Sequence, residues 1–414
     1  MEPPSLDGTG SAQRCFVPQD VPCKVSDHGD FASPGRDRSS AAVYYPGLDG
    51  LRGVAVLAVL LYHSGLIRGG FLGVDIFFTL SGFLITRLLL HERAATGTIR
   101  FRHFFLRRAL RLLPALFAFL VLWTCALLAT IPSTYWGIVG QYVVAVLLYV
   151  ANWAGIYGLP MGIFGHAWSL AIEEQFYFLW PVVVALLISK VRHPKLIVGF
   201  LAFVALMSLA WRLSLALDGA SERRIYWATD AHADGLLLGA AAAFLAISPH
   251  PSRGAGLPHP VAGLIAATGL GGLLLTAAYN PSYVYGGTGL TAIATVTVIL
   301  AIVRGSSFLA RLLGMQWLVW VGRISYGLYL WHFPIFSQFG VLKLPGEVAP
   351  HVQVFLAWGA TFGIAFASYV FIERPALAYR DRFRWARTNV APARHAPQHA
   401  FGATESPSVP SGLA

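Results

Sequence analysis

Side chains that can move a proton near neutral pH lie at the ends of strongly apolar segments of this sequence. His63 lies near the end of the first apolar run, and Asp75 lies near the beginning of the second. A titratable residue is costly in such a run, so each is a candidate functional residue. A helical hairpin would set the two at similar depth, where they can pair. We predict that His63 is a general base for a hydroxyl group, with Asp75 or Glu174 fixing its tautomer.

Other titratable residues are expected at the same depth, at the outer ends of later apolar runs. They are Glu173, Glu174, Asp234 and His332. As single residues, they are equally well explained as interfacial side chains that contact lipid headgroups. Their convergence from separate segments favours a site. Glu174 and His332 are the alternative bases if His63 is not the one.

Arginines supply the charge for an anion site. Arg52 precedes His63 by 11 residues, which places both on one helix face, roughly 16 Å apart. In the cluster of Arg107, Arg108 and Arg111, the first and last are four residues apart and share a face. Guanidinium groups suit bidentate phosphate binding. The alternatives are ordinary topology arginines or arginines that bind lipid headgroups.

The composition places these residues in a membrane protein. Of 414 residues, 56% are hydrophobic and 12% are charged, which is more apolar surface than a soluble fold can bury. Runs of roughly 18 to 22 apolar residues are long enough to cross a bilayer as helices. The net charge of +11 does not indicate nucleic-acid binding, because Lys and Arg lie between the apolar runs. We expect an all-α, polytopic integral membrane helical bundle.

The distribution of basic residues predicts about ten transmembrane helices. The segments from Arg93 to Arg111 and from Arg374 to Arg387 are rich in arginine and should be cytosolic. Counting helices forward from the first segment places the stretch after Gly155 inside the cell, whereas counting backward from the second places it outside. One apolar run between Leu112 and Gly155 should therefore be re-entrant, interfacial or fused with its neighbour. The prediction is a multi-pass protein of the cell membrane with both termini cytoplasmic.

Three segments are expected along the chain. Residues 1–43 are predicted to be a disordered cytosolic segment without the pattern of a cleaved signal peptide. Residues 44–376 form the transmembrane domain, and residues 377–414 form a basic and then disordered cytosolic tail. We find no zinc-binding or disulfide pattern, nucleotide loop or nucleophile elbow, and we expect no metal cofactor.

Several separated blocks resemble the acyltransferase-3 family of membrane O-acyltransferases, over roughly Tyr45 to Pro375. Their order and spacing, rather than any single block, carry the resemblance. The blocks are Leu48–Gly53 leading to His63, Gly70–Phe78, Leu80–Ile85, Arg107–Arg111 with Pro114, His166–Leu170, Glu173–Tyr177, Ser325–Tyr326, Tyr329–His332 and Glu373–Pro375.

The resemblance implies an enzyme that takes its acyl group from acyl-CoA, with acetyl-CoA as the expected donor. It implies that His63 and Arg52 take part in catalysis and that Arg108 and Arg111 handle the donor. Many members also carry an extracytoplasmic hydrolase-like domain. For this chain the resemblance implies the membrane-only form.

The resulting hypothesis is acyl transfer to a hydroxyl. The CoA nucleotide binds at the basic cluster, its pantetheine arm runs past Arg52, and the thioester reaches His63. The acceptor is a carbohydrate, a lipid-linked sugar or a cell-envelope glycan, or else a macrolide or other secondary metabolite. The main alternative is a transporter or flippase, in which the same polar groups line a solute path. The absence of internal repeats disfavours it.

Overall fold

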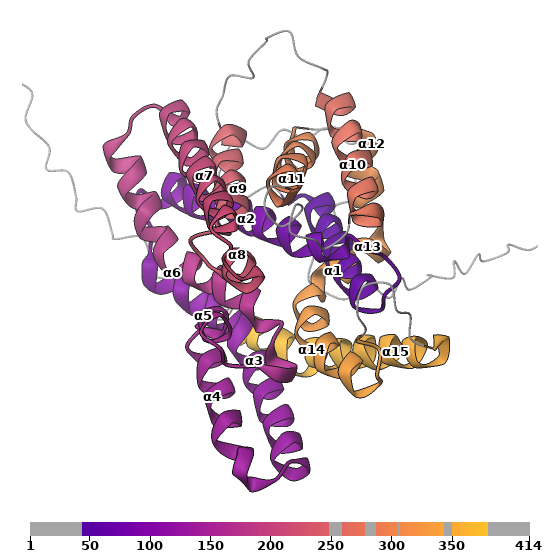
Figure 1. The fold of residues 1–414 in the computed structure, drawn as a ribbon. Coiled ribbons are helices and arrows are strands. Elements are labelled where there is room, and N and C mark those ends of the chain that lie inside the picture. The colour runs from indigo at the N-terminus through magenta and orange to yellow at the C-terminus, as the bar shows by residue number, and fades with distance from the viewer. Residues whose placement is uncertain (1–43, 248–258, 278–286, 305–306, 343–349, 380–414) are drawn as a thin grey trace, which may run out of the picture. The chain divides into compact units, whose positions relative to one another are not determined.

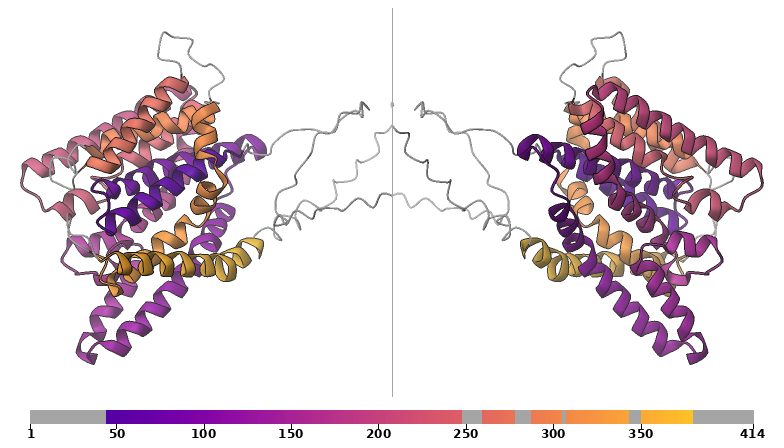
Figure 2. Two further views of the ribbon diagram at one scale, coloured as in Figure 1. Left: turned by 90° about the vertical axis from the view of Figure 1, so that its right-hand side faces the viewer. Right: turned by 90° about the vertical axis from the view of Figure 1, so that its left-hand side faces the viewer.

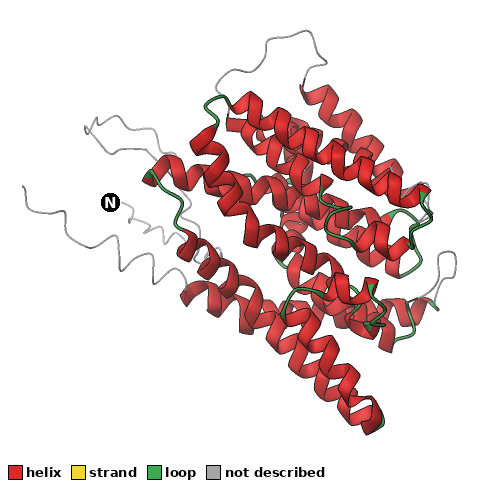
Figure 3. Cartoon of the chain, turned by 60° about the vertical axis from the view of Figure 1, so that its left-hand side comes forward, coloured by secondary structure: helices red, strands yellow, loops and turns green. Residues whose placement is uncertain are grey.

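The structure is a computed structural model that describes residues 44–247, 259–277, 287–304, 307–342 and 350–379. Within these ranges every regular element is a helix and no β-strand occurs (Figure 3). This confirms the predicted all-α class. The predicted disordered segment 1–43, and all but the first three residues of the predicted tail 377–414, lie outside the described residues.

The helices follow the apolar runs of the sequence (Figure 1). Those before residue 165 are α1 (Pro46–His63), η1 (Gly70–Leu72), α2 (Gly73–Thr96), α3 (Phe101–Thr130), η2 (Ser133–Tyr135), α4 (Trp136–Leu147), α5 (Ala151–Ile156) and η3 (Gly162–Phe164). Those after it are α6 (Ala167–Lys190), α7 (Pro194–Leu217), α8 (Glu222–Trp227), α9 (Asp234–Ile247), α10 (His259–Thr276), α11 (Thr288–Val303), α12 (Ser307–Leu313), α13 (Gln316–Arg323), α14 (Ser325–Gln338), α15 (His351–Ser368) and the π-helical turn η5 (Tyr369–Glu373).

Local sequence signals set the ends of the helices that carry the candidate residues. Pro46 occupies the first turn of α1, where its missing N–H has no helical partner to lose. Helix α2 ends at Gly97, whose φ of 73° is left-handed and favours glycine. These signals set the start of α1 and the end of α2.

In the part of the chain that the structure describes, five helical segments are long and apolar enough to cross a membrane, judged by length and composition: Gly70–Thr96, Phe101–Thr130, Ala167–Lys190, Pro194–Leu217 and His351–Tyr379. Three shorter apolar helices, Asp234–Ile247, Pro260–Thr276 and Thr288–Val303, accompany them. The presence of these apolar helices supports the prediction of a membrane protein. The predicted count of about ten transmembrane helices is not confirmed.

The segment in which the charge pattern conflicted forms a helical hairpin. Helices α3 and α4 contact one another, and in Figure 1 they run side by side at one end of the fold. Helix α4 has 12 residues, so it is about 18 Å long, shorter than the ~30 Å hydrocarbon core of a bilayer. The expectation that one apolar run between Leu112 and Gly155 is re-entrant, interfacial or fused with its neighbour stays a prediction.

Helices α1 and α2 lie at the centre of the packing. Helix α1 contacts α2, α13 and α14, and α2 also contacts α6, α9 and α11; Figure 2 shows both indigo helices between the other elements. Helices α2 and α9 approach one another closely because each has a glycine at the contact. A Cβ on Gly239 would lie 1.9 Å from the carbonyl oxygen of Thr79, and one on Gly82 would lie 1.9 Å from that of Leu236.

We predict that Gly239→Ala destabilises the protein by about 1–3 kcal/mol, because the new methyl group would force α2 and α9 apart. Gly199 of α7 is the matched control, since no atom lies within 4 Å of the position of its Cβ. Gly199→Ala should be neutral or stabilising by up to about 1 kcal/mol. The measurement is the thermal unfolding midpoint of each variant in detergent. Equal midpoints for the two variants would contradict the close helix contact.

Candidate active site

A cavity of about 330 Å³ lies between α1, α2, α3, α6 and α14. Its charged lining residues are Asp49, Arg52, Arg108, Arg111 and Glu173. The remaining wall combines hydroxyl groups, among them Ser169 and Tyr329, with apolar side chains of α2. The cavity therefore places several charges from separate helices against a common space.

Arg108 is held in a fixed orientation at the wall of the cavity. Its guanidinium group lies 3.6 Å from the centre of the Tyr177 ring, a cation–π contact. Its Nε donates to Glu174 at 3.4 Å. Arg108 and Arg111 are three residues apart on α3 and both line the cavity, because residues at this spacing lie on one helix face.

Arg52 and Arg111 carry charges that no side chain neutralises by direct contact. Among the described residues, neither forms a hydrogen bond or a salt bridge within 4 Å. Arg111 is repelled electrostatically by both Arg52 and Arg108. Guanidinium groups that repel one another across a cavity favour an anion between them, and phosphate oxygens match their geometry.

Two residues predicted for this region lie elsewhere or act differently. Arg107 points away from the cavity and donates to Glu92 of α2 at 3.3 Å. Glu174 contacts Arg108, not His63, so the expectation that it orients His63 is wrong. Glu173 lines the cavity and accepts a hydrogen bond from Ser81 at 2.7 Å.

A cluster of three histidines lies beyond the cavity. Tyr329 lines the cavity and His332 is on the next turn of α14. The rings of His63 and His332 have centroids 5.1 Å apart, and those of His332 and His166 are 5.7 Å apart. The predicted base His63 is thus in contact with His332, which was predicted to lie at the same depth. His166, which sequence analysis did not single out as a site residue, completes the cluster.

The backbone of α14 holds two of these rings, and a proline explains the contact with His166. Pro334 has no N–H, so the carbonyl of Leu330, four residues earlier, lacks its helical donor. Nε2 of His166 donates to this carbonyl at 3.1 Å. Nδ1 of His332 donates to the carbonyl of Tyr329 at 2.6 Å. The backbone of α14 therefore fixes both histidines, of which His332 is completely buried.

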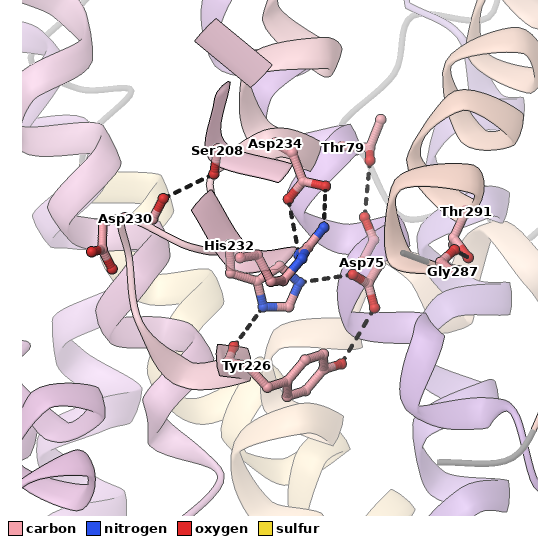
Figure 4. A network of polar contacts seen from close by, with 10 residues as sticks. Asp75, Thr79, Ser208, Tyr226, Asp230, His232, Asp234, Gly287 and Thr291 are labelled. Atoms are coloured by element: carbon pink, nitrogen blue, oxygen red, sulfur yellow. Dashed lines mark hydrogen bonds and ion pairs between the residues drawn. The ribbon is translucent and has the colours of Figure 1, made fainter. Parts of the chain in front are cut away.

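Asp75 belongs to a different polar network (Figure 4). Its Oδ1 lies 2.8 Å from Nε2 of His232, and its Oδ2 accepts from the hydroxyl of Tyr226 at 3.3 Å. Nδ1 of His232 lies 2.6 Å from the carbonyl of Tyr226. Both ring nitrogens of His232 thus face oxygen atoms, one of them in the Asp75 carboxyl group. The expectation that Asp75 pairs with His63 is wrong, because His232 takes its carboxylate.

The titratable residues expected at one depth therefore form separate groups. Asp234 makes a two-fold hydrogen bond with Arg212 of α7, at 2.8 and 3.3 Å, and both side chains are buried. Because a lone charge in an apolar helix is costly, each finds the nearest opposite charge. The sequence signal for Arg212 was a single arginine in the apolar run of α7.

The hydroxyl groups of Ser169 and Tyr329 are further site residues that sequence reasoning did not single out. They lie 2.6 Å apart, and the Tyr329 hydroxyl also donates to the carbonyl of His166 at 3.1 Å. Both lie in blocks of the family resemblance, but only the fold brings them together from positions 160 residues apart. Ser169 lies close to His166 in the sequence, and Tyr329 lies close to His332, so these two residues connect the cavity wall with the histidine cluster.

The fold and the site define a helical membrane protein with a cationic cavity next to a histidine cluster. A family model described as an acyltransferase domain (acyltransferase 3) matches residues 45–370. The peptidoglycan O-acetyltransferase OatA of Listeria monocytogenes is 36% identical over 352 residues, which cover 80% of this chain and 56% of that protein. The O-acetyltransferase OatA of Staphylococcus aureus is 35% identical over 347 residues, which cover 80% of this chain and 57% of that protein. No solved structure matches the chain.

The chain belongs to the acyltransferase-3 family, because the family model covers most of its length. This confirms the resemblance to the acyltransferase-3 family. The chain spans little more than half the length of the curated relatives it matches.

We predict that Asp75→Ala lowers the free energy of unfolding by about 3 kcal/mol, because it leaves His232 without its buried partner. His63→Gln should change it by about 1 kcal/mol or less, since His63 is only partly buried and glutamine can hydrogen-bond. Thermal unfolding in detergent measures both. A similar loss of stability in the two variants would contradict the separation of Asp75 from His63.

Proposed function

We propose that the protein is a membrane O-acyltransferase that moves an acetyl group from acetyl-CoA to a hydroxyl of a carbohydrate, a lipid-linked sugar or a cell-envelope glycan. The observation that carries the proposal is the cavity in which Arg52 and Arg111 face one another without a contacting carboxylate. A membrane protein that leaves two cations in this state is suited to an anionic ligand.

The cavity fits the polar end of an acyl-CoA donor. Its phosphates would lie among Arg52, Arg108 and Arg111, of which Arg108 is already oriented by Tyr177 and Glu174. Apolar side chains and the hydroxyls of Ser169 and Tyr329 suit the pantetheine arm, which is polar only in patches. Arg52 and His63 are 11 residues apart on α1, a rise of about 16 Å, so the thioester would lie well above the phosphates.

In the proposed reaction His63 is the general base. The acceptor hydroxyl loses its proton to His63 as its oxygen attacks the thioester carbonyl. The new C–O bond forms, the C–S bond breaks, and the proton passes from His63 to the sulfur of the departing CoA. Proton transfer of this kind contributes a rate gain of about 10²–10⁴.

The relatives support a glycan acceptor, since one is named a peptidoglycan O-acetyltransferase. We therefore place a glycan hydroxyl ahead of a macrolide or other secondary metabolite. A transporter or flippase is the contrasting function, and it would bind acetyl-CoA without consuming it. Release of free CoA by purified protein supplied with acetyl-CoA and soluble peptidoglycan fragments distinguishes the two.

The proposed arrangement in the cell membrane follows the charge pattern. It has about ten spans with both termini in the cytoplasm, so that Arg108 and Arg111 bind the donor from the cytosolic side and His63 lies toward the outer side. A reporter fused at residue 390 tests this arrangement. A signal from outside the cell would contradict it.

We predict that Arg111→Gln weakens the binding of acetyl-CoA by about 10- to 100-fold, the loss expected for one charged hydrogen bond to phosphate. Arg107→Gln is the control, because Arg107 is on the same helix but donates to Glu92 outside the cavity. Its affinity should stay within about threefold of the parent. Calorimetric titration of detergent-purified protein measures both dissociation constants. Equal losses in the two variants would argue against phosphate binding in the cavity.

We predict that His63→Gln abolishes transfer while the affinity for acetyl-CoA changes little. Glutamine keeps a hydrogen-bonding group but cannot take up a proton at neutral pH, and the phosphates bind at the opposite end of the site. The measurement is the rate of CoA release at saturating donor and acceptor. A rate within a few-fold of the parent would show that His63 is a structural residue.

A further inference from the structure

The hydrogen bonds of His332 determine which of its ring nitrogens carries a proton. A carbonyl oxygen only accepts, so Nδ1 of His332 donates to Tyr329 at 2.6 Å. Complete burial beside two other imidazoles disfavours a charged ring, and a neutral imidazole has one N–H. Nε2 of His332 is therefore an unprotonated acceptor.

The same reasoning fixes the tautomer of His63. Its Nδ1 faces two acceptors, the carbonyl of Val59 at 3.0 Å and the unprotonated Nε2 of His332 at 3.3 Å. Both contacts are favourable only when Nδ1 of His63 carries the proton. Nε2 of His63 is then free to accept one.

We propose that His332 is a positioning residue that, together with the carbonyl of Val59, holds His63 in the tautomer with an unprotonated Nε2. The inference rests on the proposed function and deepens it, because it gives His332 the task that the sequence assigned to Asp75 or Glu174. His332 is not itself the base, since its Nε2 faces His63 and its Nδ1 is engaged by Tyr329.

Neighbouring rings keep His332 in this orientation. Phe336 lies edge-on to it, with centroids 5.8 Å apart and an interplanar angle of 87°. His166, anchored to Leu330, packs edge-on at 5.7 Å and 74°. Phe333 packs edge-on against His63 at 5.3 Å and stacks on His166. The acceptor nitrogen of His332 is therefore presented by a packed aromatic cluster.

This arrangement also serves the charged state of His63. When Nε2 takes the proton from the acceptor hydroxyl, the ring becomes a cation whose Nδ1–H still donates to Val59 and His332. Hydrogen bonds from a charged donor are stronger than neutral ones. His332 stabilises the imidazolium of His63 as a hydrogen-bond acceptor, and its own proton stays on Nδ1.

Nitrogen-15 spectra of protein labelled in its histidine rings test the inference without reference to activity, because protonated and unprotonated ring nitrogens resonate far apart. His63→Gln and His332→Gln assign the signals. In the parent protein at neutral pH, both rings should carry their proton on Nδ1. His332→Phe keeps the ring but removes one of the two acceptors of Nδ1, so the share of His63 that carries its proton on Nδ1 should fall although Val59 still accepts. A proton on Nε2 of His63 in the parent, or an unchanged His63 spectrum in His332→Phe, would overturn the proposal.

A kinetic comparison separates positioning from a purely structural role. His332→Phe should lower kcat for acetyl transfer to peptidoglycan fragments by at least about tenfold, with the KM for acetyl-CoA and the unfolding midpoint nearly unchanged. His332→Gln, whose side-chain oxygen can accept from His63, should recover most of the loss, and the exposed control His351→Phe should match the parent. A fully active His332→Phe overturns the positioning role. An inactive parent would instead contradict the proposed function, and the spectra would still decide the tautomer.

Discussion

Every charged side chain among these apolar helices needs a partner from another helix, because the hydrocarbon core offers no water to solvate it. Arg212 finds Asp234, and Asp75 finds His232. These satisfied pairs fasten α7 to α9, and the segment before α9 to α2. Against these pairs Arg52 and Arg111 stand out, because both face the cavity and neither contacts an anion among the described residues.

A missing backbone donor organises the other half of the site. Pro334 frees the carbonyl of Leu330, which binds His166, while the carbonyl of Tyr329 binds His332. The two histidines thus take their positions from the backbone of α14 and not from carboxylates. Since Tyr329 also lines the cavity, α14 connects the proposed binding site of the donor with His332, which contacts the proposed base His63.

Apolar run length was sufficient to predict the helical class and the membrane location. The arginine cluster of α3 was predicted as an anion site, but the spacing favoured Arg107 and Arg111 on one face, whereas Arg108 and Arg111 line the cavity and Arg107 pairs with Glu92. Helical periodicity also placed Arg52 and His63 on the same helix at different heights. Pairing could not be predicted in this way. Asp75 and His232 are 157 residues apart, and a depth estimate does not say which neighbouring helix faces a side chain. The same limit hid the contact of Glu174 with Arg108.

In the proposed function one site holds the donor at both ends, with its phosphates at the arginines and its thioester at His63. A structure of the detergent-purified protein with acetyl-CoA bound tests this most directly. We expect the phosphates between Arg52, Arg108 and Arg111. We expect the thioester carbonyl near Nε2 of His63, at a distance that an acceptor hydroxyl between the two would fill. Phosphates bound away from these arginines, or a thioester remote from His63, would contradict the account.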